Sequence, residues 1–518
     1  MNMQDKRYNV CRVIAAALML LCTTAVTAQE DTNFKMSKSL EIFNSIYRGL
    51  DMMYVDTLDA EKTVGTGISA MLRSLDPYTV YYPEDKTKEL RTMITGKYAG
   101  IGALIRYNLK DKRVVIDEPY EGTPAQEAGL KKGDEILSID DSVMTDKDVA
   151  YVSNHLRGDA GTTFLLKVRR PETGKTLEKK ITRRPIQLPA MPYYGVENDS
   201  VGYINLNSFT EDCAKEFRYA LIDLKKQGIK NLVLDLRGNG GGSLSEAVKI
   251  VNMFVPKGKT VVTTKGKIAR AKSEYKTTVE PIDTITPMVV LVNGETASAS
   301  EITSGALQDY KRATILGTKT FGKGLVQVPI DMPYNGQLKL TTSKYYLPSG
   351  RCVQGTGVVP DLEVKADSLP NIVFYLSASG VDSTEVMFEY VKDYLQKHPT
   401  IAPAKDFDLT DEEYDEFKQR VLTSGFTYDP QSAKVMKELK KIMEFEGYYD
   451  DAKTEFEQLE KKLQHNLARD LDRHKKIIKQ AIVADIVAAY YYQRGIVQVA
   501  LRNDRQYEEA LKFFNNKK

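Results

Sequence analysis

Short apolar runs alternate with helical apolar patterns between residues 201 and 310, and this alternation restricts the fold more than any other feature. The expected strands are Val201–Leu206, Asn231–Leu236 and Met288–Val292, and the expected helices are Ala214–Lys226, residues 244–254 and a helix from Ser300. Continuous apolar runs of this kind are typical of strands buried on both faces. We therefore expect a mixed α/β core in this part of the chain.

The turn between the strand Met288–Val292 and the next helix carries Ser298. A hydroxyl at such a turn lies beside the amide groups of a helix N-terminus, which is a position suited to a nucleophile. Further on, Lys323 lies between two glycines, and Gln327 follows it. On chemistry alone two ordinary interpretations stay open, because a serine before a helix is commonly an N-cap and a lysine between glycines commonly contacts solvent.

A glycine cluster, Gly238-Asn239-Gly240-Gly241-Gly242-Ser243, follows the strand Asn231–Leu236. Such a corner between strand and helix brings backbone N–H groups to one point, where they hold either a phosphate or an oxyanion. A dinucleotide-binding frame would need glycine at Ser243, and a P-loop would need Gly-Lys-Ser/Thr. The cluster therefore does not predict a nucleotide site.

Several segments resemble the carboxyl-terminal processing peptidases, which are serine proteases with a Ser-Lys dyad and an inserted PDZ domain: Thr296–Ile302, Gly305–Asp309, Thr320–Gln327, Asp235–Asn239, Pro348–Arg351 and Gly357–Asp361. The resemblance runs from about residue 45 to about residue 365. It implies a crotonase-like mixed α/β protease core in which Ser298 is the nucleophile and Lys323 the general base. It also implies that Gln327 orients the lysine.

The same resemblance implies an oxyanion hole formed by the backbone amides of Gly241 and Ala299. Gly240 stands where the family often has proline, so the choice of Gly241 over Gly242 stays open. Asp309 is the nearest acid in sequence to the expected site. A carboxylate paired with the lysine would oppose its role as a base, so we expect a structural role for Asp309.

Histidine is an unsuitable base here, because His155, His398, His465 and His474 all lie outside the α/β core. A Ser-His-Asp triad would need a histidine from another domain. Free lysine has a pKa of about 10.4 and holds its proton at neutral pH. Burial disfavours the charged form, so apolar residues around Lys323 would lower the pKa and leave an amine able to accept the serine proton.

Residues 98–185 look like a PDZ domain with short strands and turns. The loop Gly100-Ile101-Gly102-Ala103 precedes a strand at Leu104–Tyr107, and a second strand is expected at Val114–Ile116. Consecutive amides in a glycine loop form a nest for a terminal carboxylate, and an exposed strand edge pairs with an extended peptide. The alternatives are a PDZ domain kept for folding or for binding internal loops.

Basic residues precede a short apolar stretch at the N-terminus: Lys6, Arg7 and Arg12 come before Val13–Cys22, with Val26-Thr27-Ala28 after it. This arrangement predicts a secretory signal peptide cleaved before Gln29, and hence an exported, periplasmic protein. The apolar core is short for a membrane span. A lipidated Cys22 and an uncleaved anchor are the alternatives, the first disfavoured by Leu21.

The expected organisation is multidomain α/β: a signal peptide (1–28), a helical N-terminal region (29–97), the PDZ domain (98–185), the protease core (186–365) and a charged helical C-terminal domain (366–518). Two apolar stripes, one with Phe43 and Ile46 and one with Ile68 and Leu72, predict the N-terminal helices. Ile478, Ile482 and Ile486 form a stripe in the C-terminal domain, which is expected to be solvated or to bind a second copy or an adaptor.

The chain has 518 residues and a formal net charge of +3, with no dense basic run, so nucleic acid is not an expected partner. Only Cys213 and Cys352 would remain after cleavage, and we expect neither a structural disulfide nor a metal or other cofactor. The function predicted is an endopeptidase that recognises free C-termini of proteins or peptides. A non-catalytic PDZ scaffold and, more remotely, an acyl-CoA enzyme are the alternatives.

Overall fold

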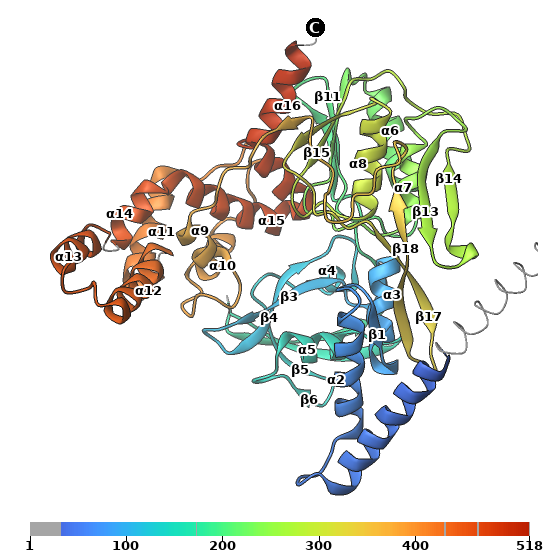
Figure 1. Cartoon of the computed structure of the whole chain (residues 1–518). Coiled ribbons are helices and arrows are strands. Elements are labelled where there is room, and N and C mark those ends of the chain that lie inside the picture. The colour runs from blue at the N-terminus through green and yellow to red at the C-terminus, as the bar shows by residue number, and fades with distance from the viewer. Residues whose placement is uncertain (1–32, 172, 429–430, 464–465, 517–518) are drawn as a thin grey trace, which may run out of the picture. The chain divides into compact units, whose positions relative to one another are not determined.

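The computed structural model describes residues 33–171, 173–428, 431–463 and 466–516 (Figure 1). The expected signal peptide and Cys22 therefore lie outside the described residues. The chain divides into two compact units, one formed by Met1–Tyr82 with Pro329–Leu340 and the other by Pro83–Val328 with Thr341–Lys518.

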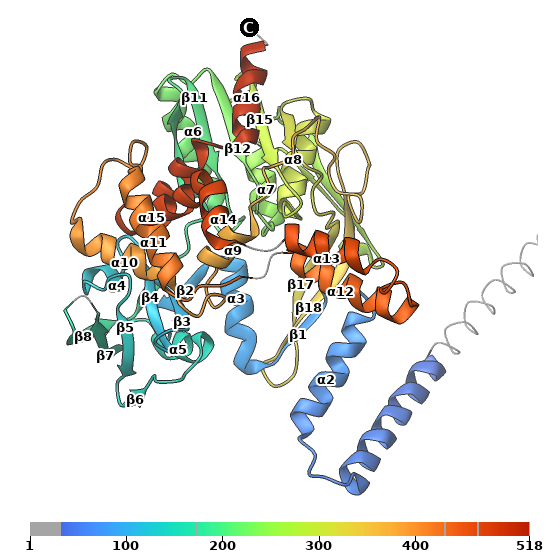
Figure 2. The ribbon, with the colours of Figure 1, turned by 90° about the vertical axis from the view of Figure 1, so that its left-hand side faces the viewer.

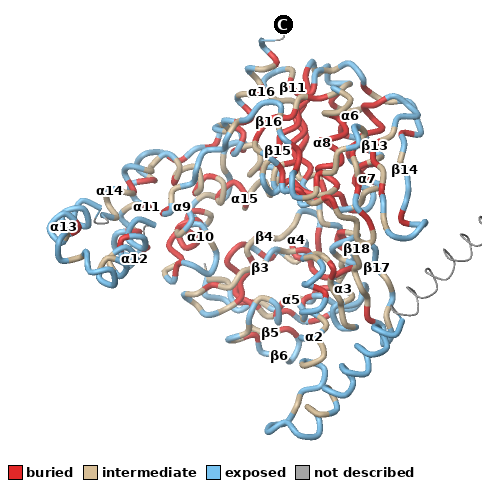
Figure 3. Tube along the Cα trace, in the orientation of Figure 1, coloured by how far each residue is buried: buried red, intermediate tan, exposed pale blue. Residues whose placement is uncertain are grey.

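The first unit is built from helices and a small strand pair. It contains a helix over residues 33–53, α2 (Ala60–Arg73) and β1 (Val80–Tyr82), which pairs antiparallel with the beginning of β18 (Gln337–Tyr346). The predicted stripes do lie on helices, but Phe43 is 51% and Ile46 59% exposed, so this stripe is not a core in the structure (Figure 3). Amphipathic spacing identified the helix without identifying what covers it.

The region expected to be the protease core contains a six-stranded sheet. Its order is β10 (Tyr193–Glu197), β11 (Val201–Asn205), β12 (Asn231–Asp235), β15 (Met288–Val292), β16 (Thr314–Gly317) and β19 (Leu362–Glu363). The pairs from β11 onward are parallel, and β10 is antiparallel to β11. Every residue of β11, β12 and β15 is buried, which explains why these strands appear in the sequence as continuous apolar runs.

Helices cover both faces of this sheet. The first face packs against α6 (Cys213–Lys226), α7 (Leu244–Val251) and α8 (Ala299–Asp309). The other face packs against α16 (Arg505–Asn516) (Figure 2). The Tyr507, Ala510 and Phe514 side chains of α16 are buried in a cluster with β-strand residues such as Leu291. The last helix of the chain is thus a layer of the protease core and not part of a solvated appendage.

A second sheet region adjoins α8 in the same unit. The end of β18 pairs with β13 (Thr260–Gly266), which pairs with β14 (Ser273–Lys276). β17 (Leu325–Asp331) also pairs with β18. None of the strands expected from the sequence corresponds to β13 or β14. A short 3-10 helix, η2 (Ala269–Ala271), separates those two strands.

The PDZ fold contains a sheet in the order β3 (Ala103–Asn108), β4 (Arg113–Pro119), β5 (Glu135–Ile139), β7 (Thr163–Arg170) and β8 (Lys175–Thr182), with β6 (Ser142–Val143) paired to β5. Its helices are α4 (Pro124–Glu127) and α5 (Val149–Leu156). Before and beside it lie η1 (Glu84–Lys86), α3 (Thr87–Thr95) and the pair β2 (Lys97–Gly100) with β9 (Arg184–Gln187). β3 lies at one edge of this sheet and contacts α5, as peptide addition requires.

The C-terminal part is helical: α9 (Asn371–Ser377), α10 (Val386–Lys397), α11 (Asp411–Thr423), α12 (Gln431–Glu446), α13 (Lys453–Lys462), α14 (Leu467–Arg473) and α15 (Lys475–Leu501). Ile478, Ile482 and Ile486 are fully buried in a hydrophobic cluster of their own. The predicted stripe is therefore the core of this domain. None of the described helices has both the length and the apolar character needed to cross a membrane.

Candidate active site

Ser298 occupies the turn between β15 and α8, where its backbone has φ 57° and ψ −115°. Positive φ is costly for a residue with a side chain and persists only where the surroundings impose it. The side chain is half-buried at the start of an 11-residue helix. A strained serine at a strand-to-helix turn is a recurrent arrangement for nucleophiles.

Gly241 lies directly against this turn. Its φ is +101°, and a Cβ built on it would stand 2.8 Å from Ser298 Cβ and 3.0 Å from the Ala299 nitrogen. Only glycine permits that approach. A Cβ on Gly242 would instead meet the Phe209 carbonyl oxygen at 2.4 Å, so Gly242 abuts a different segment. The Gly241 N–H donates to Asn239 Oδ1 at 2.9 Å.

Glu301 links the serine turn to the lysine loop. Its Oε2 accepts the N–H groups of Ser298 and Lys323, each at 2.8 Å. Its Oε1 accepts the Gly322 N–H at 2.7 Å and the Thr320 hydroxyl at 2.6 Å. Glu301 is fully buried, and these four donors satisfy a carboxylate that would otherwise be costly to bury. Ser298 and Lys323, 25 positions apart in the sequence, thus share one acceptor atom.

Lys323, Gln327 and Asp309 are the other residues of this region that the sequence analysis singled out. Lys323 is half-buried, and Gln327 on β17 donates to Thr341 Oγ1 at 3.1 Å. Asp309 accepts the Ser349 N–H and pairs with Arg351 at 3.0 Å, so it fastens the end of α8 to the loop after β18. This is the structural role expected for it.

The loop that carries the glycine cluster forms an ion pair with a residue close to the C-terminal helix α16. The Arg237 guanidinium contacts Asp235 and also pairs with Asp504 just before α16. Burial alone would lower the pKa of Arg237, but Asp235 and Asp504 raise it well above its ordinary value. The charge therefore persists, and it ties the loop to the C-terminal layer of the core.

The PDZ loop Gly100–Ala103 is held through its carbonyl oxygens. Ile101 O accepts the Ala125 N–H, and Gly102 O accepts both the Tyr120 N–H and the Thr123 hydroxyl. Gly102 has φ +73°, and a Cβ there would lie 2.5 Å from the Thr123 side chain. Any larger residue at Gly102 would therefore distort the loop itself, as well as any ligand site.

No described histidine enters the protease core. His155 lies in α5 with its ring tilted against Tyr151, and His398 follows α10 and stacks on Tyr394. His474 separates α14 from α15. His465 lies outside the described residues. Among the residues described, no group of three or more His, Cys, Asp or Glu side chains is arranged to hold a metal ion.

Comparison with known proteins decides the family. A carboxy-terminal-processing protease from Bartonella bacilliformis is 36% identical over 356 residues, which cover 68% of this chain and 80% of the relative. This chain belongs to peptidase family S41. The model of that family matches residues 200–364, a PDZ model matches 115–170, and a model described as the C-terminal helical domain of a probable PDZ-protease matches 377–514.

Other relatives carry the same description. Carboxy-terminal processing protease CtpB from Bacillus subtilis is 33% identical over 351 residues, covering 66% of this chain and 71% of the relative. A solved structure titled photosystem II D1 C-terminal processing protease is 29% identical, covers 62% of this chain and 92% of its own, and has a TM-score of 0.37. The chain is therefore a serine-type C-terminal processing protease with a PDZ domain, as the resemblance predicted.

Sequence reasoning missed Glu301 in this S41 peptidase. The available signal was its position three residues after Ser298, the S-x-x-E spacing in which a glutamate side chain accepts the N-cap amide. The spacing indicated the contact to Ser298. It carried no information on the three donors from residues 320–323, which tertiary structure brings to the same carboxylate.

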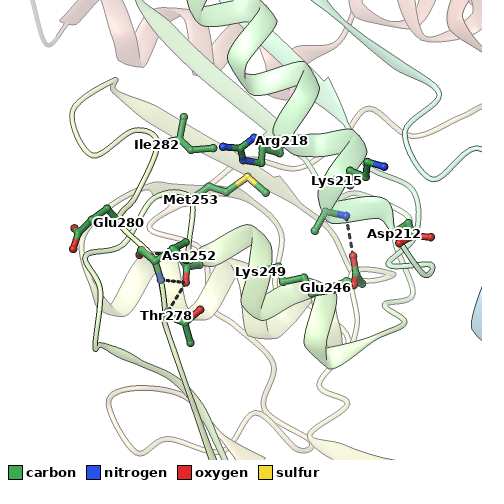
Figure 4. A pocket seen from close by; sticks show the side chains of 12 residues that line it. Asp212, Lys215, Arg218, Glu246, Lys249, Asn252, Met253, Thr278, Glu280 and Ile282 are labelled. Carbon is green, nitrogen blue, oxygen red and sulfur yellow. Dashed lines mark hydrogen bonds and ion pairs between the residues drawn. The ribbon is translucent and has the colours of Figure 1, made fainter.

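Cys213 and Cys352 are free thiols in the described part of the chain, and neither is among the predicted catalytic residues. Cys213 is buried at the start of α6, and burial together with nearby Glu246 raises the pKa of its thiol to about 12. A cavity of about 530 Å³ lies between α6, α7 and residues 278–282 (Figure 4). Its buried carboxylate, Glu246, is already bound to the Ala214 N–H and to Lys249. None of the predicted catalytic residues lines this cavity.

Proposed function

We propose that this S41 peptidase is an exported endopeptidase that hydrolyses peptide bonds with Ser298 as nucleophile and Lys323 as general base. The observation that carries the proposal is the shared Glu301 carboxylate, which holds the strained serine turn and the lysine loop together. The absence of a described histidine from the protease core supports lysine over a Ser-His-Asp arrangement.

The chemistry follows from these roles. Neutral Lys323 accepts the proton as Ser298 Oγ bonds to the carbonyl carbon, and then gives that proton to the leaving amine as the C–N bond breaks. Water attacks the resulting ester in the same way and releases the acid. Gln327 orients the lysine, and an uncharged carboxamide does so without stabilising the protonated amine as a carboxylate would.

Two backbone amides are proposed to stabilise the oxyanion of each tetrahedral intermediate. The Ala299 N–H belongs to the first turn of α8, where helix amides have no partner within the helix. The close approach of Gly241 to Ser298 supports Gly241 over Gly242 as the second donor. Because the Gly241 N–H points at Asn239, it must turn from that acceptor or share its proton when the oxyanion forms.

Incubation with an unfolded protein tests endopeptidase activity. Mass spectrometry of the products should show C-terminal fragments of several residues together with the complementary N-terminal fragments. Release of single residues from the chain end would instead indicate a carboxypeptidase, and an unchanged substrate would favour the non-catalytic scaffold.

The PDZ loop Gly100–Ala103 is proposed to bind the substrate C-terminus, with β3 pairing to the peptide. We therefore expect a peptide amidated at its C-terminus to be cleaved more slowly than the same peptide with a free acid. Binding of the two peptides to Ser298→Ala protein, measured by fluorescence anisotropy, should differ by a similar factor, because amidation leaves the scissile bond unchanged. Equal cleavage and equal binding would show that this PDZ domain does not recognise chain ends.

Export is proposed from the N-terminal sequence, which lies outside the described residues. We expect the mature chain to begin at or close to Gln29 and to accumulate in the periplasm, because Val26-Thr27-Ala28 suits signal-peptidase cleavage. Intact mass spectrometry of the protein from fractionated cells measures this. A species that begins at Cys22 with added lipid mass would show a membrane anchor instead.

A further inference from the structure

Tyr345 contacts both residues of the proposed dyad although it belongs to neither of their segments. It lies on β18 and is 1% exposed. Its hydroxyl is 2.7 Å from the Lys323 carbonyl oxygen and 3.1 Å from the Ser298 carbonyl oxygen. The single hydroxyl proton is therefore directed mainly at the lysine carbonyl and shared with the serine carbonyl.

This contact complements the one made by Glu301. Glu301 Oε2 accepts the N–H groups of Ser298 and Lys323, and the Tyr345 hydroxyl donates to the C=O groups of the same two residues. Each residue of the pair is thus held at its amide and at its carbonyl by the same two side chains. The Tyr345 N–H also donates to Gly324 O at 3.0 Å, so β18 fastens the lysine loop directly.

The hydroxyl keeps its proton near neutral pH, because a phenol ordinarily loses it only at pH ~10, and it therefore acts as a donor. Burial, together with the nearby Glu301 carboxylate, raises the pKa of Tyr345 well above its ordinary value. An ionised phenol next to two carbonyl oxygens would offer them no proton. The buried, protonated hydroxyl therefore connects the serine turn to the lysine loop through hydrogen bonds to both carbonyl groups.

We propose that Tyr345 is a positioning residue that fixes the separation of Ser298 and Lys323 by holding both of their carbonyl groups with one hydroxyl. The inference rests on the proposed dyad. Proton transfer from serine to lysine requires the two groups within hydrogen-bond reach, and small misplacements of reacting groups are costly. Loss of the hydroxyl removes a donor that the two carbonyl groups share, while the Ser298 carbonyl keeps the N–H groups of Glu301 and Ile302 and the Glu301 carboxylate still holds both amides.

The test is Tyr345→Phe, which keeps the ring and removes only the hydroxyl. We expect kcat to fall by about 10- to 100-fold, in the range that small misplacements of reacting groups produce, with KM changed by less than about twofold. The rate at which an alkyl fluorophosphonate phosphonylates Ser298, with loss of fluoride, should fall by a similar factor, because that reaction depends on the same proton transfer and needs no peptide binding.

Tyr414→Phe is the matched control. Tyr414 is fully buried in α11, and its hydroxyl donates to a backbone carbonyl, Leu471 O, at the same 2.7 Å. Both variants should unfold at similarly lowered temperatures, and only Tyr345→Phe should lose activity. All rates are measured below the unfolding temperature of either variant.

Two outcomes have different meanings. If Tyr345→Phe retains the kcat of Tyr414→Phe while Ser298→Ala is inactive, the hydroxyl is merely structural and the positioning role is overturned, although the dyad stands. If Ser298→Ala itself remains active, the proposed function fails, and the positioning role fails with it.

Discussion

Replacing Ser298 with alanine is expected to abolish hydrolysis of peptide bonds, with a fall in kcat/KM on the order of 10⁴-fold or more. Lys323→Ala should cause a loss of the same order, because the serine keeps its proton without a base. Both variants should keep the circular dichroism spectrum of the parent protein, because the Glu301 carboxylate binds the backbone N–H groups of these residues and either substitution leaves those groups in place. Cleavage of a fluorogenic peptide measures the loss.

Two neighbouring substitutions serve as controls for these variants. Ser304 lies in the same helix, and its hydroxyl donates to Ser300 O within that helix, so Ser304→Ala should retain activity. Lys319 is exposed four residues before Lys323, so Lys319→Ala should do the same. A Lys323→Ala protein with the activity of Lys319→Ala would rule out lysine as the base.

Truncation of the Phe514 side chain is expected to be among the most destabilising single changes. Phe514 is 3% exposed and belongs to the hydrophobic cluster between α16 and the protease sheet. Phe514→Ala should lower the free energy of unfolding of the protease core by about 3 to 5 kcal/mol, a large share of the roughly 5 to 15 kcal/mol that stabilises a domain. Urea unfolding followed by circular dichroism gives this value.

Phe445→Ala is the matched control, because it removes the same side chain from an exposed position. Phe445 lies on α12 and is 92% exposed, so its removal should change stability by less than about 0.5 kcal/mol. If Phe514→Ala were as stable as Phe445→Ala, α16 would not be part of the folded core. The ion pair between Arg237 and Asp504 joins the start of α16 to the loop that carries the glycine cluster. Phe514→Ala, which weakens the packing of α16, should therefore lose activity at lower urea concentrations than the parent protein.

The sequence predicted those strands and helices whose apolar residues follow a clear strand or helix pattern. β15 has the predicted bounds, and α6 begins one residue before its predicted start, because buried parallel strands and amphipathic helices leave distinct apolar patterns. The same patterns did not reveal partners. The stripes of Phe43 and Ile478 look alike in sequence, yet the first is exposed in this structure and the second is fully buried.

The candidate site divides in a similar way. The sequence identified Ser298, Lys323 and Gln327 because their neighbours match a known family motif. Such motifs contain the residues expected to take part in the reaction. Glu301 and Tyr345 act through hydrogen bonds to backbone groups more than 20 positions away, as Tyr345 does to Lys323. Such contacts depend on how β17, β18 and α8 pack together, and no local pattern in the sequence specifies that packing.

Covalent labelling of the nucleophile tests the proposed dyad most directly. The purified protein is treated with an alkyl fluorophosphonate, which bonds to an activated serine oxygen with loss of fluoride, and the adduct is located by tandem mass spectrometry. The account predicts one adduct, on Ser298, in the parent protein and in Lys319→Ala, and greatly slowed labelling in Lys323→Ala. An adduct on another residue, or labelling of Lys323→Ala at the parental rate, would contradict it.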